Sequence, residues 1–194
     1  MNMRKWVKLP SAWMEDGGLS KFKWRAETGA SETAALMVLM AIAHHADLDD
    51  GIARITYNDL TTATGISRTK VADGLEVLEK RDLVVREPDG RSTYQLTNYG
   101  EGHVWAALPA KSLYDRSGAI PMFGDFHLRK AAELDAVKIY LAFAARRDTA
   151  QNVTRITYDQ ISKYTGVHIG KIKPALGVLN INGLITVESY ERAD

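Results

Sequence analysis

The chain repeats itself at a constant interval, and this repeat restricts the possible folds more than any other feature. Residues 54–57, Arg-Ile-Thr-Tyr, return as residues 155–158, an offset of 101 positions. Thr64-Gly65 returns as Thr165-Gly166 at the same offset, and the correspondence runs from Glu32/Glu133 to Leu83/Leu184 without a gap. The leader at 6–10 also returns at 105–109, now two residues closer. One unit present twice is the simplest interpretation, and it predicts domains at 1–102 and 103–194.

Length and composition agree with two small domains. A chain of 194 residues gives each copy roughly 100 residues, which is enough to bury a core of its own. No stretch approaches the ~20 apolar residues of a membrane span, and no apolar run follows the basic residues near the start, so we expect a cytoplasmic protein without a membrane anchor. The absence of cysteine excludes disulfides, thiolate metal sites and cysteine nucleophiles.

The first half of each unit has the pattern of two helices joined by a short strand. Apolar residues at helical spacing predict a helix over about 31–45, an acidic loop over 46–52 and a short strand at Arg54-Ile55. Thr56 with Asp59, and Thr157 with Gln160, have the spacing of a capping box at the start of the next helix. Gly65 and Gly166 stand where that helix must end and reverse direction.

A third helix and a hairpin follow. Ser67 or Thr69 can cap the helix, whose Val71, Leu75 and Leu78 form an inward face. The opposite face is expected to present Arg68, Lys70, Asp73 and Gly74. Strands at 83–86 and 92–97, with Asp89-Gly90 as the turn between them, predict a β-hairpin.

This order of elements resembles a winged helix-turn-helix domain, and the resemblance covers nearly the whole chain. The expected fold is mainly α with small β-hairpins (α+β), built as two tandem winged helix-turn-helix domains. The resemblance implies that the third helix enters the major groove of DNA while the hairpin, or wing, contacts the backbone or minor groove. The leader Trp-x-x-Leu-Pro and the Ile-Thr-Tyr to Thr-Gly stretch also resemble the winged-helix modules of plasmid and phage replication initiators.

The candidate contact residues come from the start of the third helix, the wing and their counterparts in the second copy. Arg68 is the first choice for reading base edges, and Arg86 and Arg91 flank the wing turn, where they could bind phosphate. Each cation could instead be an ordinary solvated side chain. The complete set for contact with double-stranded DNA is Thr56, Ser67, Arg68, Thr69, Lys70, Arg86, Arg91, Arg155, His168, Lys171 and Lys173.

The second copy departs from this pattern. Ile169 and Gly170 replace Arg68 and Thr69, which weakens the case for base reading there. Pro174 lacks a backbone N–H, so the helix is expected to begin only at about Lys173. The chain ends soon after an acidic stretch at 188–192, which predicts a truncated or acidic second wing. Arg146, Arg147 and Lys163 are further candidates for phosphate contact in this half.

Other chemistry has little support in the sequence. His44-His45 lacks matching metal ligands, and the acidic loop Asp47–Gly51 lacks the ligand spacing of a calcium site. Tyr57 and Tyr158 are expected to pack beneath the helix-turn-helix. No nucleophile elbow or phosphate loop appears, so the sequence predicts neither an enzyme nor a cofactor.

Two functions remain open. The first is double-stranded-DNA binding, as a plasmid- or phage-type replication initiator or as a transcription regulator. The second is protein interaction without DNA binding, as in the tandem winged-helix partner subunits of chromosome-condensing complexes. A net charge of only +1, with the excess of basic residues in the second half, requires any DNA surface to be local. Mixed use is also open, with the second copy binding another protomer or a protein partner.

Overall fold

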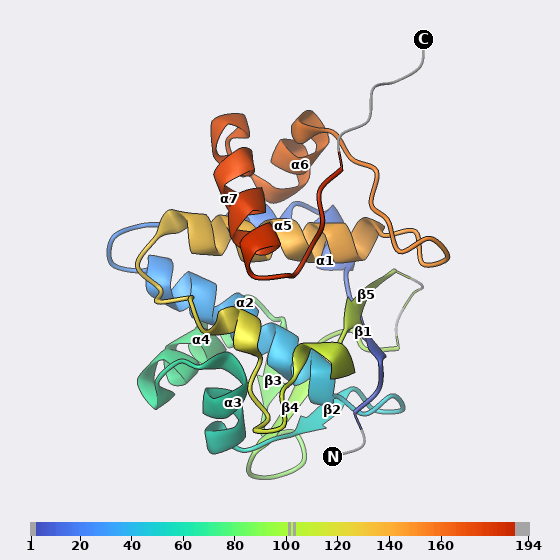
Figure 1. Cartoon of the computed structure of the whole chain (residues 1–194). Helices are drawn as coiled ribbons and strands as arrows, with labels where there is room; N and C mark the ends of the chain where they lie inside the picture. Colours follow the sequence, from blue (N-terminus) through green and yellow to red (C-terminus); the bar gives the residue numbers. More distant parts are fainter. Residues whose placement is uncertain (1–2, 101, 103, 189–194) are drawn as a thin grey trace.

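The computed structural model describes residues 3–100, 102 and 104–188. This part of the chain is mainly helical and has two small antiparallel sheets (Figure 1). Two long helices, α2 (Gly29–His45) and α5 (Ala131–Arg146), pack against each other, with one helix-turn-helix on either side of the pair. Within the described residues, no helix has the length and apolar character needed to span a bilayer.

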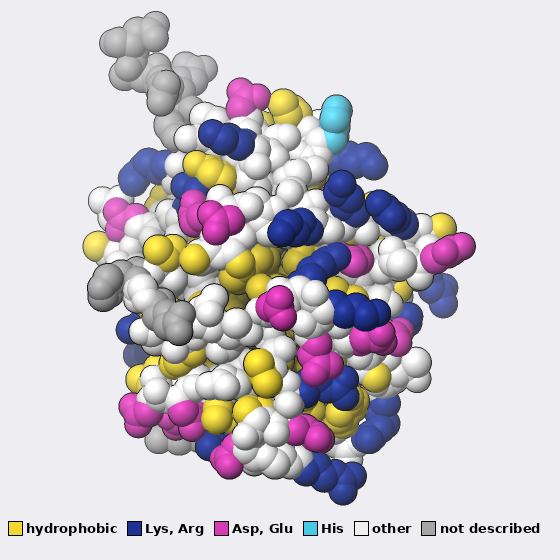
Figure 2. Space-filling view, turned by 180° about the vertical axis from the view of Figure 1, so that it is seen from behind, with side chains coloured by type: hydrophobic (Ala, Val, Ile, Leu, Met, Phe, Trp, Pro, Cys, Tyr) yellow, Lys and Arg dark blue, Asp and Glu magenta, His cyan; other side chains and the backbone are white. Residues whose placement is uncertain are grey.

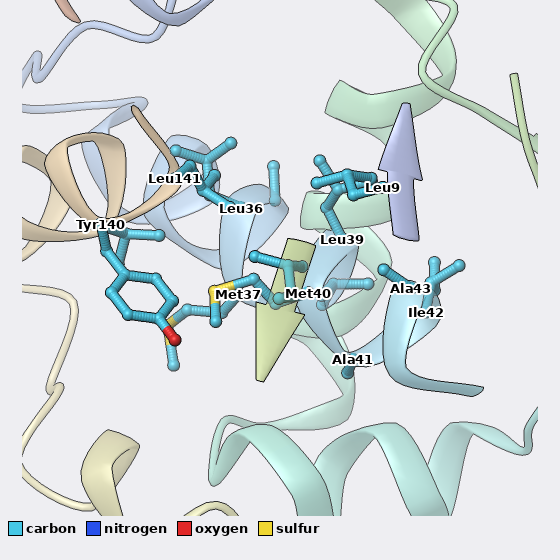
Figure 3. Packing of buried hydrophobic residues seen from close by; sticks show 14 of the residues in the cluster. Leu9, Leu36, Met37, Leu39, Met40, Ala41, Ile42, Ala43, Tyr140 and Leu141 are labelled. Carbon is cyan, nitrogen blue, oxygen red and sulfur yellow. The ribbon is translucent and has the colours of Figure 1, made fainter. Parts of the chain in front are cut away.

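Helix α2 is the centre of the hydrophobic core. Every residue from Glu32 to His44 is buried, since neighbouring elements pack against it on several sides. Figure 3 shows the side chains of α2 between Leu9, which comes from strand β1 (Trp6–Pro10), and Tyr140 and Leu141 of α5. The two halves of the chain therefore share one continuous core.

The first half contains the expected helix-turn-helix and wing. Helices α3 (Tyr57–Thr64) and α4 (Arg68–Lys80) lead into a three-stranded sheet with the order β2-β4-β3. Its strands are β2 (Ile52–Arg54), β3 (Val84–Arg86) and β4 (Thr93–Leu96). The β3–β4 hairpin is the predicted wing, and Gly90 has a positive φ of 83° in its turn.

Two boundaries differ from the sequence prediction. The first long helix begins at Gly29, two residues before the expected start at about residue 31. The strand predicted at Arg54-Ile55 is Ile52–Arg54, since Ala53 is paired with Tyr94 in the ladder. Ile55 lies beyond the ladder and donates its N–H to the Ser92 carbonyl.

The second half repeats the helical part of this arrangement. After α5 come α6 (Tyr158–Thr165) and α7 (Ile169–Ile181). Between α7 and Glu188 the structure has no strand, and the remainder of the predicted acidic wing lies outside the described residues. The predicted helix start near Lys173 is wrong. The His168 side chain caps α7 by accepting a hydrogen bond from the Gly170 N–H, so Pro174 stands inside the helix.

The two leader segments pair with each other. Strand β1 and strand β5 (Trp105–Pro109) form an antiparallel ladder in which Lys8 lies opposite Ala107. Short helical turns follow each strand: α1 (Ala12–Glu15) and η1 (Gly18–Lys21) after β1, and η2 (Lys111–Leu113) and η3 (Pro121–Phe123) after β5.

Candidate nucleic-acid interface

The turn between α3 and α4 is fixed by local hydrogen bonds. The Thr56 hydroxyl accepts from the Asp59 N–H at 3.1 Å, and the Asp59 carboxylate accepts from the Thr56 N–H at 3.3 Å, so the predicted capping box is present. Gly65 ends α3 at a φ of 72°, a conformation that glycine adopts without a steric penalty. The Ser67 hydroxyl then caps α4 by accepting from the Lys70 N–H at 3.2 Å.

Arg68 lies at the exposed start of α4 and is held across the turn by α3. Its guanidinium donates a hydrogen bond to the Asn58 side-chain carbonyl and lies 5.3 Å from the centroid of the Tyr57 ring. The cation is thereby oriented at the surface but has no carboxylate partner in these contacts. Such a side chain keeps its charge and its fork of donors available for an acceptor from outside.

The rest of the first turn of α4 is also accessible. Ser67 and Thr69 are exposed, and Lys70 is half-buried with its ammonium 3.0 Å from the Asp73 carboxylate. The sequence prediction placed Gly74 on this outer face, and that is wrong. Gly74 is buried, and a Cβ there would lie 2.9 Å from the backbone of Ala34 and Ala35 in α2.

The wing carries cations in two different states. Arg86 is half-buried and its guanidinium is 3.1 Å from the Glu79 carboxylate, so part of its charge is compensated within the protein. Arg91 is exposed in the wing turn. Arg54, on the adjacent strand, lies between Asp50 and Asp89, and its hydrogen bonds to both carboxylates raise the pKa of its guanidinium. Arg91 is therefore the wing cation most accessible to a phosphate.

The second helix-turn-helix has the same frame with a different surface. Thr157 and Gln160 form a capping box, and Gly166 ends α6 at a φ of 70°. At the start of α7 the predicted residues His168, Lys171 and Lys173 are exposed, as is Arg155 in the preceding loop. The counterpart of Arg68, however, is Ile169, a largely exposed apolar side chain.

Two further candidates of the second half, Arg146 and Arg147, contact side chains of the same chain. Arg146 contacts the Glu15 carboxylate and lies 3.3 Å from the centroid of the Tyr164 ring, while Arg147 lies 3.9 Å from that of Trp6. The expected burial of the two tyrosines is also only half right, because Tyr57 is half-buried but Tyr158 is 43% exposed.

Sequence reasoning missed the role of Asn58. No repeat or motif pointed to it, because its counterpart at position 159 is Asp. Its position at the start of α3, beside Tyr57, places its side-chain carbonyl next to the Arg68 guanidinium. Only the three-dimensional approach of two helix starts, ten residues apart in sequence, brings them together.

The histidine pair and the acidic loop have internal partners. His44 is buried, with its Nδ1 2.9 Å from the Tyr114 hydroxyl, and burial lowers the pKa of this imidazole to about 3. The Asp47 and Asp50 carboxylates accept hydrogen bonds from backbone N–H groups of their own loop. Across the described ranges, no group of three or more His, Asp or Glu side chains is placed to hold a metal ion.

Comparison with known proteins gives one match. Residues 32–92, less than half of the chain, match the model of the MarR family. The matched segment begins in α2 and ends in the wing, and it contains the whole of α3 and α4. It identifies this segment as a winged helix-turn-helix domain and supports DNA binding by this part of the molecule. Neither the search of curated proteins nor that of solved structures found a match.

Proposed function

We propose that this protein binds double-stranded DNA through α4 and the β3–β4 wing and acts as a regulator without catalysis. The observation that carries the proposal is the exposed first turn of α4, where Ser67, Arg68 and Thr69 project from a helix start that is capped and braced from α3. A helix start of this kind offers side chains to base edges and backbone N–H groups to phosphate.

The proposed roles follow from the position of each residue. Arg68 reads a base edge, with Thr69 beside it, because both lie on the outward side of the first turn of α4. Lys70, Arg86 and Arg91 contact the DNA backbone. Arg91 lies exposed at the wing tip, whereas Lys70 and Arg86 contact phosphate while also paired with Asp73 and Glu79. Thr56 and Ser67 can add backbone contacts while keeping their caps.

The finer function is also a proposal. We favour a transcription regulator, because the family whose model matches residues 32–92 is the one observation that separates regulators from initiators. A plasmid- or phage-type replication initiator, suggested by the Trp-x-x-Leu-Pro leader, is the alternative use of the same DNA-binding surface. A genome-wide footprint distinguishes them, since an initiator protects an origin and a regulator protects promoters.

The second helix-turn-helix is proposed to be a second unit of the same kind that has no wing among its described residues. His168, Lys171, Lys173 and Arg155 would contact phosphate there. One observation favours a different use: Ile169, at the start of α7, is 46% exposed at the position where α4 has Arg68, so this helix start offers an apolar contact to a protein partner or a second copy of the chain. A protein-interaction module would then replace DNA binding in this half.

The test is a binding assay with a pool of DNA fragments at two salt concentrations. DNA binding that depends on phosphate contacts should weaken steeply as salt rises. Arg68→Ala should reduce the preference for the selected fragment by about 5-fold to 150-fold, because a bidentate base contact is worth about 1–3 kcal/mol. Arg91→Ala should weaken binding to all fragments alike.

Lys80→Ala is the matched control, because this exposed cation of α4 is paired with Glu76 near the C-terminal end of the helix. It should leave affinity and preference nearly unchanged. If no fragment binds at either salt concentration, the proposed function is wrong. If Arg68→Ala weakens all fragments equally, the assignment of base reading to α4 is wrong.

A further inference from the structure

The β1–β5 ladder pairs equivalent positions of the two repeats. Trp6 and Trp105 start the two copies of the leader, and the central residue of each copy, Lys8 and Ala107, lie opposite each other. On either side of this pair, Trp6 is opposite Pro109 and Pro10 is opposite Trp105. An antiparallel ladder centred on equivalent residues has a local two-fold axis, so the repeats are related here as the subunits of a symmetric dimer are.

The segments that follow the two strands are exchanged between the halves. Glu15, which follows β1, pairs with Arg146 in α5 of the other half. Its counterpart Tyr114, which follows β5, contacts His44 and His45 at the end of α2. Position 146 is the counterpart of His45, so the same pair of positions meets twice.

The exchange continues further along both segments, up to the helix-turn-helix units. The Ile120 N–H donates to the Ala63 carbonyl of α3 at 3.0 Å. On the other side, Gly166 at the end of α6 lies against Ser20, whose Cβ would be 2.8 Å from a Cβ at Gly166. Each helix-turn-helix is thus packed against the leader segment of the other repeat.

This arrangement puts basic segments on the side of the molecule where both long helices begin. Lys21, Lys23 and Arg25 precede α2, Arg129 and Lys130 precede α5, and all five are exposed. The beginnings of α2 and α5 lie on the same side, between the two helix-turn-helix units (Figure 1). Figure 2 shows Lys and Arg side chains along the corresponding edge, from the upper unit to the lower one. Acidic side chains lie among them, so the surface is locally but not uniformly basic.

We infer that one chain acts as an internal dimer that binds a single DNA duplex with both helix-turn-helix units. This inference rests on the proposed function and adds the arrangement of the bound DNA. The two basic segments contact the backbone between two half-sites. The half-sites are read unequally, because α4 presents Arg68 and Thr69 where α7 presents Ile169 and Gly170. Base recognition therefore belongs to the α4 half-site and backbone contact to both.

The experiment uses the full chain with its selected duplex. The mass of the complex should equal one chain and one duplex, and a hydroxyl-radical footprint should show two protected stretches on one face of the DNA, about one helical turn or a multiple of it apart. Base substitutions in the α4 half-site should reduce binding by at least 10-fold, and those in the α7 half-site by less than about 3-fold.

Variants then test whether the basic segments contact the DNA backbone. Lys23→Ala/Arg25→Ala should lower the slope of log affinity against log salt by about 2, because each lost phosphate contact removes about 0.9. Arg4→Ala/Lys5→Ala is the matched control, since it removes the same charge from exposed residues just before β1, a strand on the opposite side of the molecule (Figure 1). It should leave the slope unchanged. Lys171→Ala/Lys173→Ala should also lower the slope, without altering sequence preference.

The outcomes separate the two proposals. Two chains on each duplex, or a footprint confined to one half-site that Lys171→Ala/Lys173→Ala leaves unchanged, overturns the internal dimer while DNA binding by α4 stands. The second of these results is the one expected if α7 binds a protein. An equal effect of Lys23→Ala/Arg25→Ala and Arg4→Ala/Lys5→Ala also overturns the inference. Absence of any DNA binding contradicts the proposed function itself.

Discussion

In the first helix-turn-helix the chain reverses at Gly65 with a φ of 72°, and in the second it reverses at Gly166 with a φ of 70°. The preceding helices start with the same capping box, Thr56 with Asp59 and Thr157 with Gln160. The outward side chains differ most clearly just after the turn, where α4 begins with Arg68 and α7 with Ile169. The backbone frame is kept in both copies because hydrogen bonds and the left-handed residue require it, whereas the outward side chains have no such requirement.

The buried contacts of the two halves differ as well. Gly74 lets α4 approach the backbone of α2 closely, while its counterpart in α7 is Ala175, also buried. His44 at the end of α2 is buried, while its counterpart at the end of α5 is Ala145. The first half is therefore the more tightly packed at α4 and the only one with a buried imidazole at this position. Three measurements can break or sharpen this comparison.

The largest change in the free energy of unfolding is expected from His44 at acid pH. Burial lowers the pKa of its imidazole from 6.5 to about 3, so below pH 6.5 the unfolded chain binds a proton that the folded chain does not. Stability contributed by the neutral imidazole is thus present above pH 6.5 and lost as the pH falls toward 3. Between pH 7 and pH 4 the loss should be about 3 kcal/mol.

The matched variant is His44→Asn, which has an amide that can still meet the Tyr114 hydroxyl but does not titrate in this range. Urea denaturation at both pH values should give a loss on acidification that is smaller in the variant by about 3 kcal/mol. Equal losses in the two proteins would mean that the acid sensitivity does not come from His44, and the comparison at this position would fail.

The next effect concerns the contact between α4 and α2. In Gly74→Ala, the new methyl group would lie 2.9 Å from two backbone atoms of α2, which are not the flexible end of a side chain. The helices must therefore separate, and overpacking of this kind costs about 2 kcal/mol. The free energy of unfolding from urea titration measures it. An unchanged value would show that α4 can move away from α2 without loss, and that the first half is no more tightly packed than the second.

Much of the helix-turn-helix was predictable because its determinants are local. Thr56, Ser67 and Gly65 mark helix ends through hydrogen bonds and backbone conformation within four residues, and these boundaries are confirmed. Gly74 was placed on the wrong face because a residue without a side chain gives no sign of burial in a hydrophobic pattern. Proline is best tolerated in the first turn of a helix, which predicts a helix start near Lys173. This prediction is wrong because the His168 cap starts α7 one turn earlier.

The exchange of the leader segments could not be predicted in this way. The two copies of Trp-x-x-Leu-Pro are 99 residues apart, and their recurrence does not reveal that they pair with each other. Nor does the sequence show that Glu15 meets Arg146 while Tyr114 meets His44. The candidate contact residues are predicted from local pattern, and apart from Arg155, which lies in the loop before α6, they lie at the expected helix starts and wing. Their role in DNA contact is still a prediction.

The smallest change in stability is expected at Gly177, and it tests whether the surface of α7 is open to solvent. Gly177 lies inside α7, and a Cβ there would meet no atom within 4 Å. Glycine in a helix interior costs about 0.5–1 kcal/mol relative to alanine, because it loses more backbone freedom on folding. Gly177→Ala should therefore stabilise the chain by that amount, the opposite sign to Gly74→Ala. A destabilised variant would mean that this part of α7 is covered in solution, and the contrast between a closely packed α4 and an open α7 would then be wrong.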